Sequence, residues 1–206
     1  MEYNQIAKEI RINKVLNELD KFVIEFVNIL EKHVGYVIVS GYVSILLGRA
    51  RASEDVDLLV PEMNLGKFSA LFKDLKEEGF ECANSSIISE AHKMLDEHAI
   101  RFYKGIPVPN MEFKKISEKI HREAFDNRIK VILKEKELFI SPLELQIAYK
   151  LSLMAKGSFE EISSDKDFED AKHLYELFKD KLNKEKLSHF IKLLKVEDKW
   201  EHLKNG

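Results

Sequence analysis

Two aspartates open a strand-like segment in the first third of the chain, and they constrain its fold more than any other feature. The segment Asp55-Val-Asp-Leu-Leu-Val60 passes from carboxylates into an apolar run, which predicts a buried strand. Side chains alternate along a strand, so Asp55 and Asp57 share one face. Two such carboxylates can share divalent cations, and they are costly to hold together without a positive partner. We therefore expect metal-dependent phosphate chemistry. The alternative is an exposed edge strand whose aspartates pair with Arg49 or Arg51.

Composition narrows the class of protein. The 206 residues are 45% hydrophobic and 33% charged, as in a soluble globular protein, and the net charge of −3 argues against coating nucleic acid through bulk charge. A basic stretch over residues 101–136 is either a solvated face or a surface that receives a polyanion. The single Cys82 excludes an intrachain disulfide and a cysteine-based zinc site. Without a signal pattern or a membrane-spanning apolar run, we expect a cytoplasmic protein with no membrane partner.

Hydrophobic periodicity divides the chain near residue 138. Residues 1–138 are predicted to form an α/β (α+β) core with a small mixed sheet and flanking helices, and residues 139–206 to form a helical region. Ser141 is the expected N-cap of the first C-terminal helix, with a capping box to Glu144. The predicted helices of the first part cover residues 3–33, 42–47 and 64–78, and the predicted strands cover residues 36–39, 55–60, 80–88, 99–103, 109–114, 128–133 and 138–140.

A small pair, Ser40-Gly41, stands between the predicted strand at 36–39 and the next helix. Small residues let the backbone approach a phosphate, and the amides at a helix start attract anions. On the strand predicted over residues 109–114, Met111 and Phe113 would face the core, so Glu112 would point the opposite way. On its own, Glu112 would be read as an ordinary strand glutamate paired with Lys114 or Lys104.

Taken together, these features resemble the signature of the nucleotidyltransferase superfamily, whose fold is shared with DNA polymerase beta. The resemblance lies in the stretch Val39-Ser-Gly-Tyr-Val-Ser-Ile-Leu-Leu-Gly-Arg-Ala-Arg-Ala-Ser-Glu-Asp-Val-Asp-Leu-Leu59. Within it, the stretch is similar to the AbiEii-like abortive-infection toxins and to minimal nucleotidyltransferases. Ser40 stands where that branch has the first of two glycines, and Val43 stands where it has a small alanine.

The predicted helical half carries two further stretches that resemble later motifs of the same branch. Lys150 and Lys156 match the first of them, and Lys166, Asp167 and Asp170 match the second. Without the resemblance, these residues would be read as a charged helix face.

The resemblance implies an enzyme that transfers a nucleoside monophosphate from a nucleoside triphosphate to an acceptor hydroxyl, such as an RNA or tRNA end. Asp55, Asp57 and Glu112 would be catalytic and would bind two Mg²⁺ ions, for which Mn²⁺ could substitute. A cognate antitoxin protein is the implied partner. The alternative is a catalytically weak nucleotide-binding module that acts as an interaction partner. The implied nucleotide-binding residues are Ser40, Gly41, Arg49, Arg51, Ser53, Lys150, Lys166, Asp167 and Asp170.

Overall fold

The computed structural model describes residues 1–154 and 165–205, and within them one mixed sheet forms the centre of the molecule. Its nine strands lie in the order β1-β2-β8-β9-β3-β4-β7-β6-β5. The strands are β1 (Glu2–Asn4), β2 (Glu9–Ile12), β3 (Val37–Ile38), β4 (Asp55–Val60), β5 (Phe80–Cys82), β6 (Ile100–Lys104), β7 (Ile106–Lys115), β8 (Ile129–Leu133) and β9 (Lys136–Ile140).

The centre of the sheet places the acidic strand between two partners. β4 is antiparallel to β3 and parallel to β7, in a register that sets Asp57 beside Glu112. The alternate residues of these strands are apolar and buried, for example Leu58 and Phe113. Because this apolar face is covered by the core, the register is fixed, and the polar side chains of both strands share the other face.

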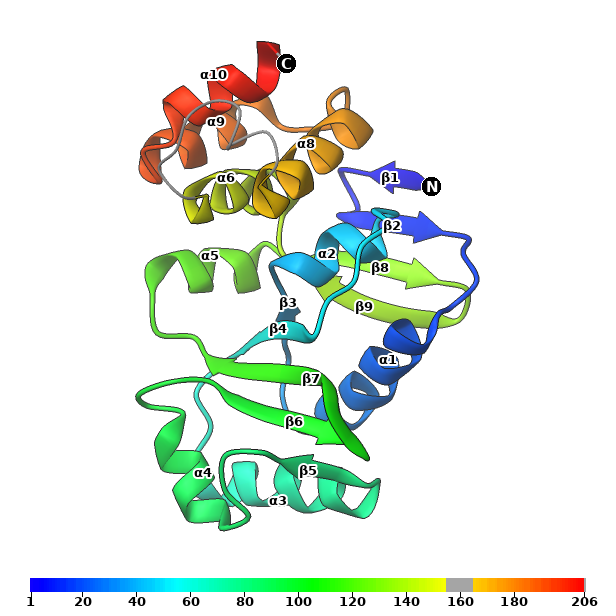
Figure 1. Ribbon diagram of the computed structural model, residues 1–206, viewed down its shortest axis with the longest axis vertical. Coiled ribbons are helices and arrows are strands. Elements are labelled where there is room, and N and C mark those ends of the chain that lie inside the picture. The colour runs from blue at the N-terminus through cyan, green and yellow to red at the C-terminus, as the bar shows by residue number, and fades with distance from the viewer. Residues whose placement is uncertain (155–164, 206) are drawn as a thin grey trace.

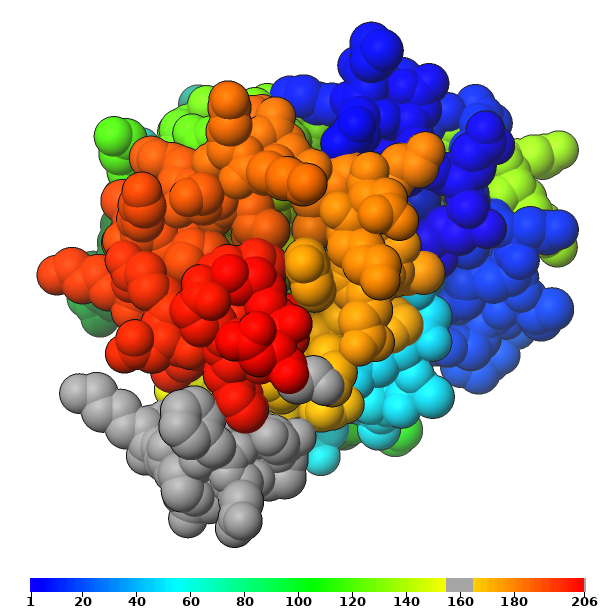
Figure 2. All heavy atoms as spheres, turned by 90° about the horizontal axis from the view of Figure 1, so that it is seen from above, coloured from blue at the N-terminus to red at the C-terminus, as the bar shows by residue number. Residues whose placement is uncertain are grey.

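Helices cover both ends of this sheet (Figure 1). α6, α8, α9 and α10 gather at one end of the long axis, and α3 and α4 lie at the other. Seen from the first end, the C-terminal helices in orange and red cover the middle of the molecule, with N-terminal residues in dark blue along one side (Figure 2). The helices are α1 (Glu18–Leu30), α2 (Gly41–Leu46), α3 (Leu65–Glu77), α4 (Ile88–Met94), α5 (Lys119–Asp126), α6 (Leu143–Leu153), α8 (Lys166–Phe178), α9 (Lys184–Leu193) and α10 (Glu197–Asn205).

This architecture confirms the predicted fold class, a mixed α/β core with a C-terminal helical region. The predicted boundary at residue 138 falls inside β9, the last strand of the sheet. Among the described residues, no helix has the length and apolar character needed to cross a membrane.

The N-terminal region is where the prediction was wrong. The expected helix over residues 3–33 is instead the hairpin β1–β2 followed by α1. Ile10 and Ile12 are buried at alternate positions of β2, which pairs with β8, whereas Ile6 in the hairpin turn is 99% exposed. Asn17 and Asp20 form a reciprocal capping box that starts α1. Strand pairing and this cap override the helical spacing of the apolar residues.

Two smaller expectations also needed correction. The predicted strand over residues 80–88 stops at Cys82 and is followed by α4, because the backbone pairs with β6 over only three residues. Ser141 is not the N-cap of α6, which starts at Leu143 after Pro142. The Ser141 hydroxyl instead donates to the side-chain oxygen of Gln146, at 2.8 Å.

Candidate active site

Two carboxylates and one ammonium group meet on the polar face of β4 and β7. Lys114 Nζ lies 2.6 Å from Asp57 Oδ1 and 2.8 Å from Glu112 Oε2. Glu112 and Lys114 are two residues apart on β7, so they share a face, and Asp57 is the register partner of Glu112 on β4. The far side of Glu112 is held by Arg101 of the neighbouring strand β6, whose Nη2 lies 2.6 Å from Oε1.

Burial and charge set the protonation of this cluster. Burial raises the pKa of Asp57, and the adjacent Glu112 adds to this effect, although Lys114 opposes it. Burial also disfavours ionisation of Glu112. Hydrogen bonds with Asp57 and Lys114 and the positive charges of Lys114 and Arg101 outweigh the effect of burial, so the pKa of Glu112 is lowered. Burial likewise works against the charge of Lys114, but its two carboxylate partners raise the pKa of Lys114 overall. Lys114 is therefore an ammonium ion at neutral pH.

Asp55 stands apart from this cluster. It lies one pleat earlier on β4, opposite Asn110, and its carbonyl oxygen accepts a hydrogen bond from the Ser53 hydroxyl at 2.9 Å. Within the described residues, its carboxylate takes part in no hydrogen bond or ion pair, and no three His, Cys, Asp or Glu side chains converge on one metal position. The fold thus brings Asp57 and Glu112 together and leaves the Asp55 carboxylate available on the same face.

The chain turns from β3 into α2 through Ser40, whose backbone is held by a glutamine from the helical region. Ser40 N donates to Gln146 Oε1 at 3.1 Å, and Gln146 Nε2 donates to Ser40 O at 2.7 Å. Ser40 has a φ of 63° and a ψ of −137°, in a region that favours glycine. A serine is thus strained at the position where the resemblance would place a glycine.

Replacing Ser40 with glycine should therefore stabilise the protein. The strain of a non-glycine residue in such a conformation is about 1–3 kcal/mol, while the freer unfolded chain of glycine removes about 0.5–1 kcal/mol. We expect Ser40→Gly to increase the free energy of unfolding by about 1 kcal/mol in urea denaturation. Ser44→Gly, inside α2, is the matched control and should lower it. Equal losses in both variants would contradict the strain at Ser40.

A second charged cluster joins the helical region to the loop that leads into β4. Lys150 on α6 is only 2% exposed, and its Nζ lies 2.6 Å from Asp167 Oδ1 and 2.8 Å from Asp170 Oδ2. Asp170 on α8 also binds Arg49, and Arg51 Nη2 lies 3.1 Å from Asp170 Oδ2. Three cations thus surround two carboxylates, and the cluster carries an excess of one positive charge.

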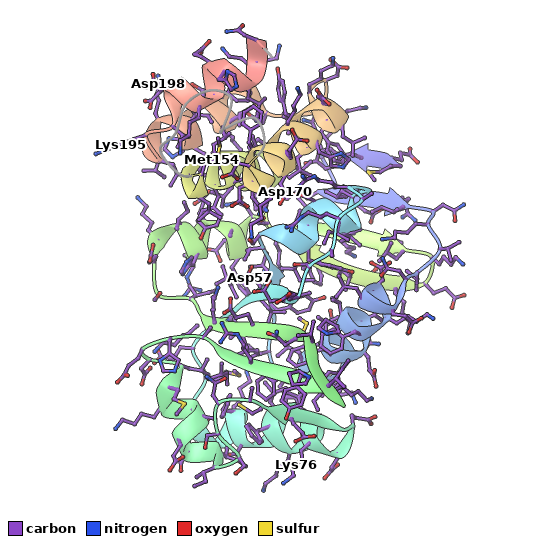
Figure 3. All side chains as sticks on the ribbon, in the orientation of Figure 1. Asp57, Lys76, Met154, Asp170, Lys195 and Asp198 are labelled. Carbon is purple, nitrogen blue, oxygen red and sulfur yellow. The ribbon has the colours of Figure 1, made fainter. Side chains whose placement is uncertain are left out.

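The two clusters lie on opposite sides of α2. This helix contacts both β4 and α8, and in Figure 3 Asp57 lies on β4 below it while Asp170 lies on α8 above it. The Arg51 guanidinium packs against Gly41 so closely that a Cβ built there would lie 2.1 Å from Arg51 Nη2. Gly41 is therefore needed for the approach of this arginine to the start of α2.

A cavity of about 70 Å³ opens beside Asp57 and Lys114. The other polar residues of its lining are Ser40, Ser141, Gln146, Tyr149 of α6 and His121 of α5, and the rest of the lining is apolar. Burial raises the pKa of Tyr149 and lowers the pKa of His121, so both rings are neutral at neutral pH. The cavity thus combines uncharged rings with one charged edge at Asp57 and Lys114.

The remaining predicted residues are spread around these clusters. Lys166 is exposed, and its carbonyl oxygen accepts a hydrogen bond from Arg49 Nη1 at 2.8 Å. Lys156 lies outside the described residues. The basic stretch over residues 101–136 does not form one face, because several of its cations are engaged in ion pairs on different strands, including Lys104 with Glu25 and Lys130 with Glu137.

Three residues of the site were not predicted as site residues, namely Lys114, Gln146 and Tyr149. Lys114 was expected only as an alternative ion-pair partner of Glu112, and the structure shows that pair at 2.8 Å. For Lys114 a signal was present, because a lysine two residues after Glu112 on a strand must share its face. Gln146 and Tyr149 reach the site only through the packing of α6 against the sheet, and nothing local distinguishes them from other helix residues.

Comparison of the structure with solved structures finds similar proteins, whereas comparison of the sequence does not. No protein-family model and no curated protein matches the sequence. An antigenic nucleotidyltransferase-like protein from Paracoccidioides brasiliensis superposes with a TM-score of 0.54 at 18% identity, over 89% of this chain and 90% of that one. The antibiotic-resistance factor ANT(2'')-Ia in solution gives a TM-score of 0.54 at 12% identity, over 90% and 97%. The structure of ANT(2'')-Ia in complex with adenylyl-2''-tobramycin gives a TM-score of 0.54 at 11% identity, over 87% of this chain and 96% of that one.

The chain has the nucleotidyltransferase fold. The match spans nearly the whole length of each protein, so the helical region belongs to the shared fold as much as the sheet does. At these identities the likeness concerns the fold alone, and the AbiEii-like branch stays a prediction.

Proposed function

We propose that the protein is a metal-dependent nucleotidyltransferase, which moves a nucleoside monophosphate from a nucleoside triphosphate to an acceptor hydroxyl. The observation that carries this proposal is the pair Asp57 and Glu112, set side by side on β4 and β7 with a cation between them. The fold supports it, since the ANT(2'')-Ia structure contains an adenylyl-tobramycin.

The donor set suits Mg²⁺ or Mn²⁺. Asp57, Glu112 and Asp55 offer carboxylate oxygens, which such hard ions prefer, and the Lys114 ammonium stands as a positive group between two of them. Two bound Mg²⁺ ions would neutralise the phosphates and orient the donor.

The chain's own residues would position the reactants and carry the proton. Glu112 is ionised and could accept the proton of the acceptor hydroxyl as that oxygen bonds to the α-phosphorus, but its lowered pKa makes it a weaker base than an ordinary glutamate. The bond from this phosphorus to the bridging oxygen breaks, and pyrophosphate leaves. The nucleoside would lie at the mouth of the cavity beside Asp57, with the Tyr149 ring of the cavity wall available for stacking.

We assign the second cluster to the phosphates and to the support of the site. Arg51 brings positive charge to the start of α2, next to Gly41, and Arg49 shares its partner Asp170. Lys150 is buried between Asp167 and Asp170, so its role in this proposal is to hold α8 against α6. Lys166 is exposed at the start of α8 and could meet the triphosphate, and Ser53 supports the backbone of Asp55.

The acceptor is the part of the proposal that the resemblance alone supports. An RNA or tRNA end is the first candidate, with an antitoxin as the partner that would restrain the enzyme. Because the basic residues of the stretch 101–136 are not gathered on one face, recognition would depend on the surroundings of the site rather than on a broad basic surface.

The test is transfer of label from α-phosphate-labelled nucleoside triphosphates to total RNA, and to an aminoglycoside, in the presence of Mg²⁺. We expect labelled product with one acceptor class, complete loss in EDTA, and recovery on addition of Mg²⁺ or Mn²⁺. Retention of nucleotide without labelled product from any acceptor would contradict the enzyme and favour the nucleotide-binding module.

A further inference from the structure

The side chain of Lys114 places a cation between two carboxylates. Its Nζ touches Asp57 and Glu112 at 2.6 and 2.8 Å, each through one carboxylate oxygen. Strands in a sheet lie about 4.8 Å apart, so these two register partners would face each other as like charges if nothing stood between them. The ammonium supplies the neutralisation that the pair needs in the metal-free protein.

We infer that Lys114 is a displaceable counter-ion that holds the metal position between Asp57 and Glu112 until a divalent ion replaces it. The inference rests on the proposed function for the identity of the ion, and it adds a residue that opposes metal binding. A divalent ion that bridges Asp57 Oδ1 and Glu112 Oε2 would occupy the place of Lys114 Nζ, so both contacts of the lysine would have to break.

The surroundings allow this exchange. The Lys114 side chain is 37% exposed, whereas those of its partners Asp57 and Glu112 are 17% and 13% exposed, so the lysine is the member of the cluster that can leave. The cavity of about 70 Å³ that Lys114 lines gives the flexible chain a place to go. Glu112 keeps its orientation during the exchange, because Arg101 holds its other oxygen at 2.6 Å.

Lys115 provides a matched control on the same strand. It follows Lys114 directly, and its side chain lies on the other face of β7, where it binds Asp96 and lies 3.7 Å from Glu62. Lys115→Met makes the same change of charge and shape as Lys114→Met without touching Asp57 or Glu112.

The experiment measures Mn²⁺ affinity of the nucleotide-free protein by calorimetry and by the electron paramagnetic resonance of free Mn²⁺. We expect Lys114→Met to bind Mn²⁺ about tenfold more tightly than the wild type, which corresponds to about 1.4 kcal/mol, and Lys115→Met to bind as the wild type does. In EDTA, Lys114→Met should melt at a lower temperature than the wild type, and Mn²⁺ should raise its melting temperature by more. Lys114→Gln, which removes the charge but keeps a hydrogen-bond donor on a side chain one bond shorter, serves if the methionine variant does not fold.

The outcomes separate this inference from the proposed function. Equal Mn²⁺ affinity in the wild type and in the folded Lys114 variant would overturn the role of Lys114. If Asp57→Asn still weakens Mn²⁺ binding in that case, the metal site of the proposed function stands. If Asp57→Asn leaves Mn²⁺ binding unchanged, the proposed metal site itself is wrong, and the inference falls with it.

Discussion

Replacing Asp170 with alanine is expected to destabilise the protein by about 3–5 kcal/mol, because it leaves buried cations without their partner. Asp170 has no exposed surface and binds Arg49, Arg51 and Lys150, which come from two different parts of the chain. Its loss would leave the loop before β4 tied to the start of α8 through the hydrogen bond from Arg49 to Lys166 O, and would leave Lys150 with Asp167 alone. The measurement is the free energy of unfolding from urea denaturation of Asp170→Ala and the wild type.

Asp167 is the matched control on the same helix. It is partly exposed and has one cationic partner, so Asp167→Ala should lower stability by a smaller amount, about 1–2 kcal/mol. Asp170→Asn keeps the shape and removes the charge, and its loss should approach that of the alanine variant. A loss below about 1 kcal/mol in Asp170→Ala would show that water or other groups replace this carboxylate, and would contradict a buried clamp.

The second large effect is on activity. Asp57→Asn should reduce kcat/KM for nucleotidyl transfer by a factor on the order of 10³ or more, which is about 4 kcal/mol of transition-state stabilisation. The amide keeps the shape of Asp57 but lacks the charge that a divalent ion needs. The same substitution should leave the stability unchanged or raise it, since burial and the neighbouring Glu112 both disfavour the charge of Asp57.

Asp96→Asn is the control for this prediction. Asp96 is also paired with a lysine of β7, but on the other face of the strand, through Lys115. Its replacement should leave kcat/KM within about twofold of the wild type, since single surface ion pairs contribute about 0–1 kcal/mol. Transfer by Asp57→Asn within tenfold of the wild type would remove Asp57 from the catalytic machinery.

The spacing of apolar residues correctly predicted those helices and strands whose buried positions recur regularly along the element. β4 was predicted from its apolar run, and α3 from its amphipathic spacing between Asn64 and Gly79. The N-terminal region was not, because β1 and β2 exist only through pairing: β2 lies beside β8, which is remote in sequence. A short segment with both helical and alternating apolar positions takes the form that its partner strand stabilises, and a single sequence does not reveal that partner.

The orientation of the two aspartates and the burial of β4 follow from the local sequence alone. Asp55 and Asp57 must share a face because side chains alternate along an extended chain, and the apolar residues after them place that strand in a core. Which groups contact those carboxylates depends on how distant segments of the chain pack together. The tertiary structure placed Lys114 and Glu112 against Asp57 through the register of β4 and β7, and it joined Asp170 to Arg49 through the packing of α8 near α2. The physical reason is that an ion pair requires contact within a few ångströms, and such contact between distant segments is set by core packing and strand register rather than by local spacing.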